Sequence, residues 1–218
     1  MNLTDLRKKV LETANLLPKY GLVWMAGGTI CARDPQTGYV VVTPSGIPYE
    51  NLTPADMIVT DIEMNLIEGK YRPSVALNLW TGFLRARPDL NAVVHTHSPY
   101  ATAFSVINKP IPVVTETMAD WFGQPIAVAP YLSVEDERFA SLPVEILGDG
   151  FGVLLGQHGV ITLGATLEHA LERAVTLEEA ARTYTIARMI GSPLEFTAEM
   201  ARNSFDYYHN RYGQKKTK

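Results

Sequence analysis

The chain has 218 residues, 46% of them hydrophobic, and a formal net charge of −4. This size suits one domain with a large core, and because no basic stripe is present we expect no nucleic-acid partner. The only cysteine, Cys31, rules out an intrachain disulfide framework and fits a reducing compartment. Charged residues interrupt the first apolar stretch, and no run approaches the ~20 apolar residues of a membrane span. We therefore expect a cytoplasmic protein that has no membrane partner.

The first half of the chain predicts one helix and several short strands. An apolar stripe at helical spacing begins after Thr4, which is placed to cap that helix, and continues to Leu17. Glycine- and proline-rich turns then separate expected strands at 30–32, 39–43 and 57–60. Glu68-Gly69 marks a turn, and a helix is expected from about Val75 to Arg87.

The second half begins with a strand from Ala92 whose unbroken apolar run predicts burial on both faces. Ser98 and Pro99 then open a helix that reaches about Ile107. The later expected elements are a helical turn at 117–122, a strand at 126–129, a weak helix or turn at 135–142, paired strands at 152–155 and 160–163, and helices at 166–190 and 198–212. We predict a single α/β domain over residues 1–214, with a central, mostly antiparallel sheet flanked by helices, and a charged tail at 215–218.

Two histidines stand at the end of the central strand. Residues i and i+2 of a strand face the same way, so His95 and His97 project together. Such a pair can share a divalent metal, or it can simply be two polar residues on a half-exposed strand end. His158, between glycines in the turn of the paired strands, would complete three nitrogen ligands and leave the metal open to substrate. His169 lies in a helix, where a surface position is expected, whereas His209 in the last helix is either a surface residue or an acid of a second site.

The spacing of these motifs resembles the class II aldolase/adducin family. The matching segments are Asn91-Ala92-Val93-Val94-His95-Thr96-His97-Ser98 and Gln157-His158-Gly159, supported by residues 43–49, 87–89 and 164–170. The resemblance spans roughly residues 21–181. It implies that His95, His97 and His158 hold a divalent ion, Zn²⁺ first, with Mn²⁺ or Co²⁺ as alternatives. It also implies a homotetramer whose sites lie between subunits.

The resemblance further implies an enzyme of carbohydrate metabolism that acts on a ketose phosphate. The reaction is retro-aldol cleavage of a carbon–carbon bond with stabilisation of the enediolate. Ala119-Asp120-Trp121-Phe122 and Tyr212-Gly213-Gln214 are similar to epimerase segments in which the aspartate and the tyrosine are acid/base residues. Without the resemblance, Asp120 is equally a helix-cap or turn residue, and Tyr212 an aromatic residue packed at a helix end.

The phosphate-binding segments depart from the family pattern. Thr29 replaces the usual asparagine, and Val75-Ala76 replaces a serine followed by an acidic residue. The aldolases carry their glutamate acid/base where this chain has Ala76, and the epimerases also use an acidic residue there. The remaining candidates for phosphate or substrate binding are Gly28, Thr29, Ser45, Gly46 and Ser74.

Three functions follow in order of preference. The first is an L-ribulose-5-phosphate 4-epimerase-like activity, an isomerase reaction that uses Asp120 and Tyr212. The second is an L-fuculose-phosphate-aldolase-like lyase with a changed acid/base residue. The third is a non-catalytic, adducin-like assembly protein, which would have no need of three metal ligands.

Overall fold

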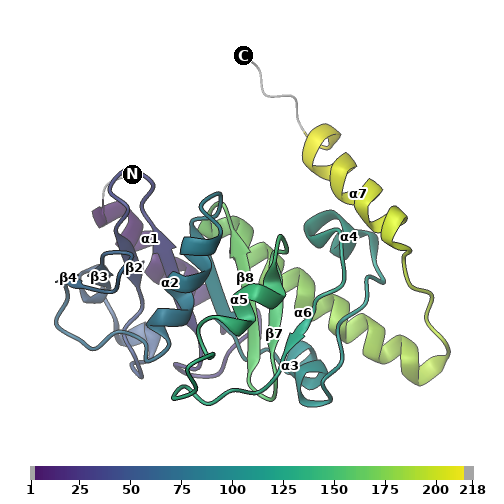
Figure 1. Cartoon of the computed structure of the whole chain (residues 1–218), viewed down its shortest axis with the longest axis horizontal. Helices are drawn as coiled ribbons and strands as arrows, with labels where there is room; N and C mark the ends of the chain where they lie inside the picture. Colours follow the sequence, from purple (N-terminus) through teal and green to yellow (C-terminus); the bar gives the residue numbers. More distant parts are fainter. Residues whose placement is uncertain (1–2, 214–218) are drawn as a thin grey trace.

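The structure, a computed structural model, describes residues 3–213 and is built around one eight-stranded sheet (Figure 1). Its order is β4-β3-β2-β1-β5-β8-β7-β6, in which β6 and β7 are parallel and the other neighbours are antiparallel. The strands are β1 Thr29–Arg33, β2 Val40–Val42, β3 Ile58–Thr60, β4 Leu66–Glu68, β5 Ala92–Thr96, β6 Val128–Ala129, β7 Gly152–Leu155 and β8 Gly159–Gly164. The predicted mostly antiparallel sheet is confirmed.

Helices cover both faces of the sheet. The α-helices are α1 Leu3–Leu16, α2 Leu77–Ala86, α3 Pro99–Val106, α4 Glu116–Phe122, α5 Leu142–Leu147, α6 Leu167–Ile190 and α7 Ala198–Arg211, and the 3₁₀ helices are Tyr49–Asn51 and Pro54–Asp56. One core lies between the sheet and α1 with α6, and a second lies between the sheet and α2 with α5. A third core extends the α6 layer through α3, α4 and α7. The predicted layer of helices on a central sheet is thus observed (Figure 1).

The central strand β5 is buried along its whole length, as its apolar run predicts. Ala92 and Val94 contribute to the core beneath α1 and α6, whereas Val93 contributes to the core beneath α2. His95 has the same parity as Val93, so its side chain belongs to the α2 face.

One local prediction was wrong and one strand was missed. Thr4 lies inside α1, where Leu3 is already helical, so it does not cap that helix. The edge strand β4, Leu66–Glu68, was not predicted; its three residues are exposed and lack the burial pattern of an inner strand. The helix or turn expected at 135–142 is observed as turns and a bend, and α5 begins at Leu142, because Pro143 favours the first turn of a helix. The predicted tail at 215–218, together with Gln214, lies outside the described residues.

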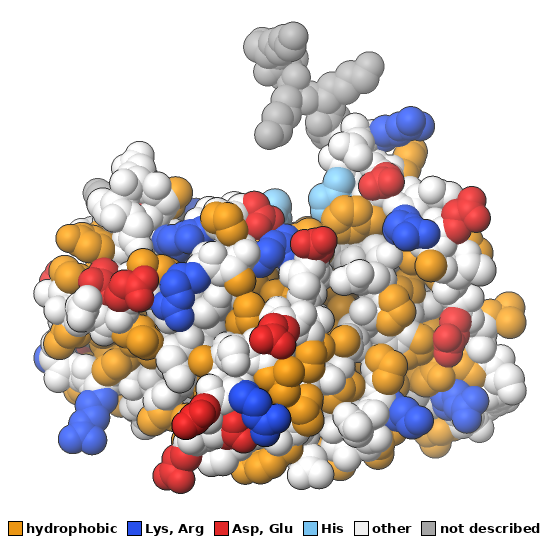
Figure 2. All heavy atoms as spheres, viewed as in Figure 1, with side chains coloured by type: hydrophobic (Ala, Val, Ile, Leu, Met, Phe, Trp, Pro, Cys, Tyr) orange, Lys and Arg blue, Asp and Glu red, His pale blue; other side chains and the backbone are white. Residues whose placement is uncertain are grey.

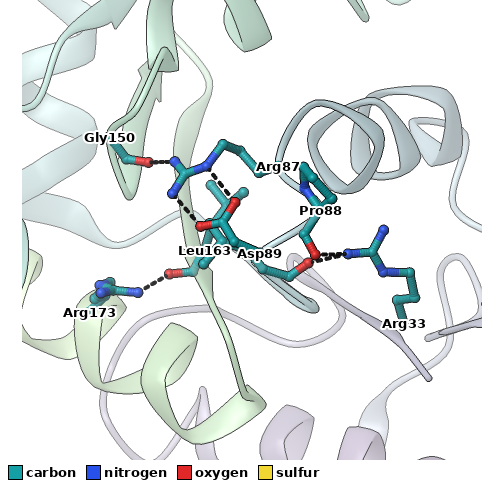
Figure 3. A network of polar contacts seen from close by, with 8 residues as sticks. Arg33, Arg87, Pro88, Asp89, Gly150, Leu163 and Arg173 are labelled. Carbon is teal, nitrogen blue, oxygen red and sulfur yellow. Dashed lines mark hydrogen bonds and ion pairs between the residues drawn. The ribbon is translucent and has the colours of Figure 1, made fainter. Parts of the chain in front are cut away.

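Arginines fix the end of the sheet where Ala92 pairs with Gly164 (Figure 3). Arg33 donates to the carbonyl oxygens of Pro88 and Leu90, and Arg87 pairs with Asp89 and donates to Gly150. Buried Arg173 of α6 donates to the carbonyl oxygen of Leu163 at 2.7 Å and to that of Trp121 at 3.1 Å. The last two bonds tie the start of α6 and the end of α4 to this end of β8.

The surface carries both signs of charge. Figure 2 shows acidic and basic side chains interspersed on one face, without a continuous basic stripe. Within residues 3–213, no helix has both the length and the apolar content needed to cross a membrane.

Candidate metal centre

Three imidazoles meet at the end of β5 opposite the arginine network. β5 delivers His95 and His97, and the turn between β7 and β8 delivers His158. The pairing of Thr96 with Val160 brings these two segments side by side. The centroids of the three rings lie 4.8 to 5.1 Å apart, and one nitrogen from each ring lies within 4.8 Å of the others. The prediction that His95 and His97 share a face, with His158 beside them, is confirmed.

His95 is held with one nitrogen free for a ligand bond. Its Nδ1 lies 2.9 Å from the carbonyl oxygen of Val160, so Nδ1 carries the hydrogen and Nε2 keeps a lone pair. That Nε2 lies 3.0 Å from Nε2 of His97. Two nitrogen ligands of a tetrahedral zinc ion would lie about 3.3 Å apart, from Zn–N bonds of 2.0–2.1 Å. Trp80 of α2 stacks on the His95 ring at a centroid distance of 5.0 Å and fixes its plane.

The three imidazoles favour the neutral form, which is the form that binds metals. Burial, reinforced by the neighbouring His158 and His97, holds the pKa of His95 well below its ordinary value. Burial also lowers the pKa of His97 and of His158.

Gly159 makes the close approach of the three rings feasible. A Cβ atom at this position would lie 2.5 Å from the carbonyl oxygen of Thr96, 2.8 Å from Cδ2 of His97 and 3.2 Å from Cε1 of His95. This first position of β8 is therefore restricted to glycine. The donor set, its neutral form and the directed Nε2 of His95 together fit a divalent ion such as zinc.

Two of the predicted substrate-binding residues, Gly28 and Thr29, lie beside His95. Thr29 of β1 pairs with His95, so the two side chains share a face of the sheet. Gly28 precedes it, where a Cβ would lie 2.8 Å from the carbonyl oxygen of His95. Ser45 donates its backbone N–H to the carbonyl oxygen of Arg72. This bond draws the exposed Ser45 and its neighbour Gly46 toward the segment that contains Ser74.

Ser74 is linked to His95 through Trp80. Its hydroxyl oxygen accepts a hydrogen bond from the Trp80 indole nitrogen at 3.1 Å, and the same indole stacks on His95. Val75 is 78% exposed beside it, whereas Ala76 is only 6% exposed. Among the described residues, no carboxylate joins the three histidines within the 4.8 Å group.

Asp120 and Tyr212 lie elsewhere in the same chain. Asp120 of α4 accepts a 2.7 Å hydrogen bond from the Ser204 hydroxyl of α7. Tyr212 is 66% exposed and stacks on Tyr208 at a centroid distance of 5.0 Å. Trp121, the residue after Asp120, is held beside Leu163 by the two hydrogen bonds of Arg173. Leu163 lies three residues along β8 from Val160, which is about 10 Å in a strand. Asp120 is therefore close to Ser204 and is not a member of the group formed by His95, His97 and His158.

The two histidines outside this group are exposed, as predicted for His169 and as one of the two alternatives for His209. His169 and His209 both lie against the ring of Trp121, at centroid distances of 5.8 and 6.4 Å. Sequence reasoning did not identify Trp80 or the Val160 carbonyl as neighbours of His95. No local signal marks either one, because each contact joins elements that are distant in the chain.

Comparison with known proteins agrees with this fold. The family model described as "Class II Aldolase and Adducin N-terminal domain" matches residues 8–185. An L-fuculose 1-phosphate aldolase structure superposes with a TM-score of 0.90 at 24% identity, covering 94% of this chain and 96% of its own.

Two further structures are similar over most of their length. YgbL from Escherichia coli, described as a candidate aldolase, epimerase or decarboxylase, has a TM-score of 0.84 and 25% identity and covers 93% of this chain and 99% of its own. The L-fuculose-1-phosphate aldolase from Thermus thermophilus has a TM-score of 0.75 and 25% identity, with coverages of 87% and 98%. With the family model matching residues 8–185, the chain belongs to the class II aldolase and adducin family.

Proposed function

We propose that His95, His97 and His158 hold a divalent ion, Zn²⁺ in the first place, with Mn²⁺ and Co²⁺ as alternatives. The observation that carries the proposal is the convergence of three imidazoles, one of them oriented by the Val160 carbonyl. Three protein ligands leave a position open to substrate, as in catalytic sites. When bound, the ion supplies Lewis-acid stabilisation of the negative charge that develops on a ketose as its carbon–carbon bond breaks.

The protein's own residues must then move the protons. Ala76 has no proton to transfer, and within the described residues no carboxylate lies in the histidine group. We assign the two acid/base roles to Asp120 and Tyr212, because inversion of a centre requires proton transfer on either face. The Ser204 hydroxyl orients the carboxylate of Asp120, and the exposed ring of Tyr212 is accessible to a partner.

A homotetramer with sites between subunits reconciles these positions. The histidines and the α4 end lie at opposite ends of the β5–β8 pair, so one chain does not supply both sets to one site. In the proposed assembly, Asp120 and Tyr212 of one subunit serve the histidines of its neighbour. The assembly follows the family resemblance, and the separation within the chain supports it.

The proposed substrate is a ketose phosphate. Thr29 shares the face of His95, and Ser74 is joined to His95 through Trp80. With Gly28, Ser45 and Gly46, these residues offer hydroxyl and backbone N–H donors for a phosphate, of which Ser45 N–H already bonds to Arg72.

The reaction we favour is an L-ribulose-5-phosphate 4-epimerase-like one. This preference rests on Asp120, which has a defined hydrogen-bond partner, and on Tyr212; Ala76 removes an acidic residue that both the aldolases and the epimerases use. The second candidate is an L-fuculose-phosphate-aldolase-like lyase, supported by the similarity to two fuculose-phosphate aldolase structures. A non-catalytic adducin-like role would not require these three converging histidines.

An NMR time course of the zinc-loaded protein with L-ribulose 5-phosphate tests the proposal. We expect D-xylulose 5-phosphate to appear, and no product with His95→Ala. Dihydroxyacetone with glycolaldehyde phosphate would instead establish the lyase. No turnover of L-ribulose 5-phosphate or of L-fuculose 1-phosphate by the zinc-loaded protein would contradict both enzyme candidates.

A further inference from the structure

Helix α6 carries a buried carboxylate on its apolar side. Glu178 is 7% exposed and lies among Ala174, Leu177 and Ala181, all of which are buried. Its Oε1 accepts a hydrogen bond from the backbone N–H of Tyr100, and its Oε2 accepts one from that of Ala101, both at 2.9 Å. Both oxygens are therefore committed to the first turn of α3, 77 and 78 residues away in the chain.

This contact replaces the usual local cap of α3. Ser98 occupies the N-cap position but makes no side-chain cap bond, and its hydroxyl is buried without a hydrogen-bond partner in residues 3–213. Pro99 has no N–H to satisfy. The orphan N–H groups of the first turn are met by Glu178, whose charge also suits the positive end of the helix.

The anchored turn lies directly beside the metal centre. α3 begins two residues after His97. Helix α6 starts at the Gly164 end of β8 and runs back along that strand. The helix rises roughly 16 Å over the 11 residues from Leu167 to Glu178, and the five residue steps from Gly164 to Gly159 span the same length in the strand. Glu178 therefore reaches the level of the strand end from which His95 and His97 project.

Helix α3 also contacts the segment that carries the third histidine, His158. Gln157, which has a positive φ of 54°, donates its backbone N–H to the carbonyl oxygen of Ser105 in α3 at 3.3 Å. His158 is the next residue. Helix α3 thus joins both chain segments that supply the imidazoles, and Glu178 anchors the start of that helix.

We infer that Glu178 is a positioning residue for the metal centre. It touches none of the three imidazoles; it acts through α3, which it holds against the segments that carry His95, His97 and His158. The inference rests on the proposed metal function. It predicts that the carboxylate of Glu178 sets the affinity for the ion and not only the stability of the fold.

The test is the Zn²⁺ dissociation constant of the folded protein, measured by competition with a chromophoric chelator. Glu178→Gln keeps the size of the side chain but offers one acceptor oxygen where two are needed. We expect about tenfold weaker Zn²⁺ binding, the lower end of the range for residues that support metal ligands. Glu179→Gln is the matched control: it makes the same charge change on the next, exposed residue, and should keep the wild-type constant.

A purely structural role gives a different result. It would lower the melting temperature of apo Glu178→Gln while the folded variant bound Zn²⁺ as tightly as the wild type, and that outcome overturns the inference. If Glu178→Gln does not fold, Glu178→Asp takes its place. Its shorter side chain keeps the charge but draws back from α3, and it must also bind Zn²⁺ more weakly.

A measurement on the unaltered protein completes the test. Because coupling is reciprocal, Zn²⁺ should slow hydrogen exchange at the amides of Tyr100 and Ala101. Unchanged exchange at both amides would overturn the inference. If the wild type binds no Zn²⁺, the metal proposal itself fails and takes the inference with it; if it binds Zn²⁺ and Glu178→Gln binds equally well, only the role of Glu178 fails.

Discussion

His95 shows how one side chain of the proposed metal site is held in place. The Val160 carbonyl fixes its tautomer, Trp80 fixes its plane, and burial keeps it neutral. The contacts with Val160 and Trp80 come from two different elements, β8 and α2. The imidazole therefore needs little further ordering when an ion binds, which is the advantage of a preformed site.

Gly159→Ala should disrupt this arrangement through one methyl group. The added Cβ would press on the Thr96 carbonyl and on the rings of His95 and His97. We expect a loss of about 1–3 kcal/mol in the free energy of unfolding, typical of overpacking, together with weaker metal binding. Chemical denaturation and chelator competition measure the two effects. Gly191→Ala is the control, because a Cβ there has no neighbour within 4 Å; equal behaviour of the two variants would contradict the steric argument.

Asp120→Asn should slow turnover while leaving metal binding intact. An amide cannot exchange a proton as a carboxylate does, so we expect a fall in kcat on the order of 10²–10⁴-fold. Steady-state kinetics with L-ribulose 5-phosphate measure it. The exposed Asp149→Asn serves as the control. An unchanged kcat for Asp120→Asn would reduce Asp120 to a residue that joins α4 to Ser204 of α7.

At the scale of elements, the 3₁₀ helix Pro54–Asp56 offers a pH test. Asp56 accepts hydrogen bonds from Thr53 N–H and from the Thr53 hydroxyl, and pairs with Lys70 at 2.6 Å. The bond from Lys70 and those from Thr53 lower the pKa of Asp56 to about 2. Because the folded pKa lies below the unfolded value of about 3.9, this stabilisation is complete above pH 4 and is lost as the pH falls toward 2.

Asp56→Asn should therefore lower the melting temperature at pH 7 and flatten its decline between pH 4 and pH 2. Thermal unfolding followed by circular dichroism across this range measures both effects. Glu50→Gln, in the preceding 3₁₀ helix, is exposed and should leave the profile unchanged. An equally steep decline in Asp56→Asn would show that other carboxyl groups carry the acid sensitivity.

Elements with a strong local pattern were predictable from the sequence. The burial of β5, the α6 helix and the β7–β8 pair all follow from apolar periodicity and turn residues. Strand β4 has exposed residues and is paired along one edge only, so no burial pattern reveals it. Helix α5 was not predicted, because Pro143 can end a helix as well as occupy its first turn.

The candidate site, too, could be predicted from the sequence only in part. Strand parity predicts that His95 and His97 lie together, and the glycines around His158 indicate a close approach. The role of Glu178 depends on a contact with Tyr100 and Ala101 across the fold, yet a glutamate on the apolar stripe of α6 was a signal that could have been followed. The sequence could not predict that Asp120 lies away from His95, His97 and His158, because strand pairing and the Arg173 bonds determine its position.

For the whole molecule, the proposed sharing of sites between subunits predicts complementation. His95→Ala and Asp120→Asn should each be nearly inactive. When subunits of the two variants are mixed and reassembled in equal amounts, about a quarter of the sites combine an intact His95 from one subunit with an intact Asp120 from its neighbour. About a quarter of wild-type activity should therefore return. Activity assays before and after reassembly measure the gain. A mixture as inactive as its parts would mean that each chain uses its own Asp120.

The most direct test of the account is the metal content of the purified, dialysed protein, measured by mass spectrometry of the elements. We predict one divalent ion per chain in the wild type, a loss of that ion in His95→Ala and in His158→Ala, and its retention in His169→Ala, which changes an exposed histidine outside the group. A wild-type protein that binds no divalent ion even when Zn²⁺ is supplied, or a His95→Ala variant that binds it as tightly as the wild type, would contradict the metal centre on which the proposed chemistry depends.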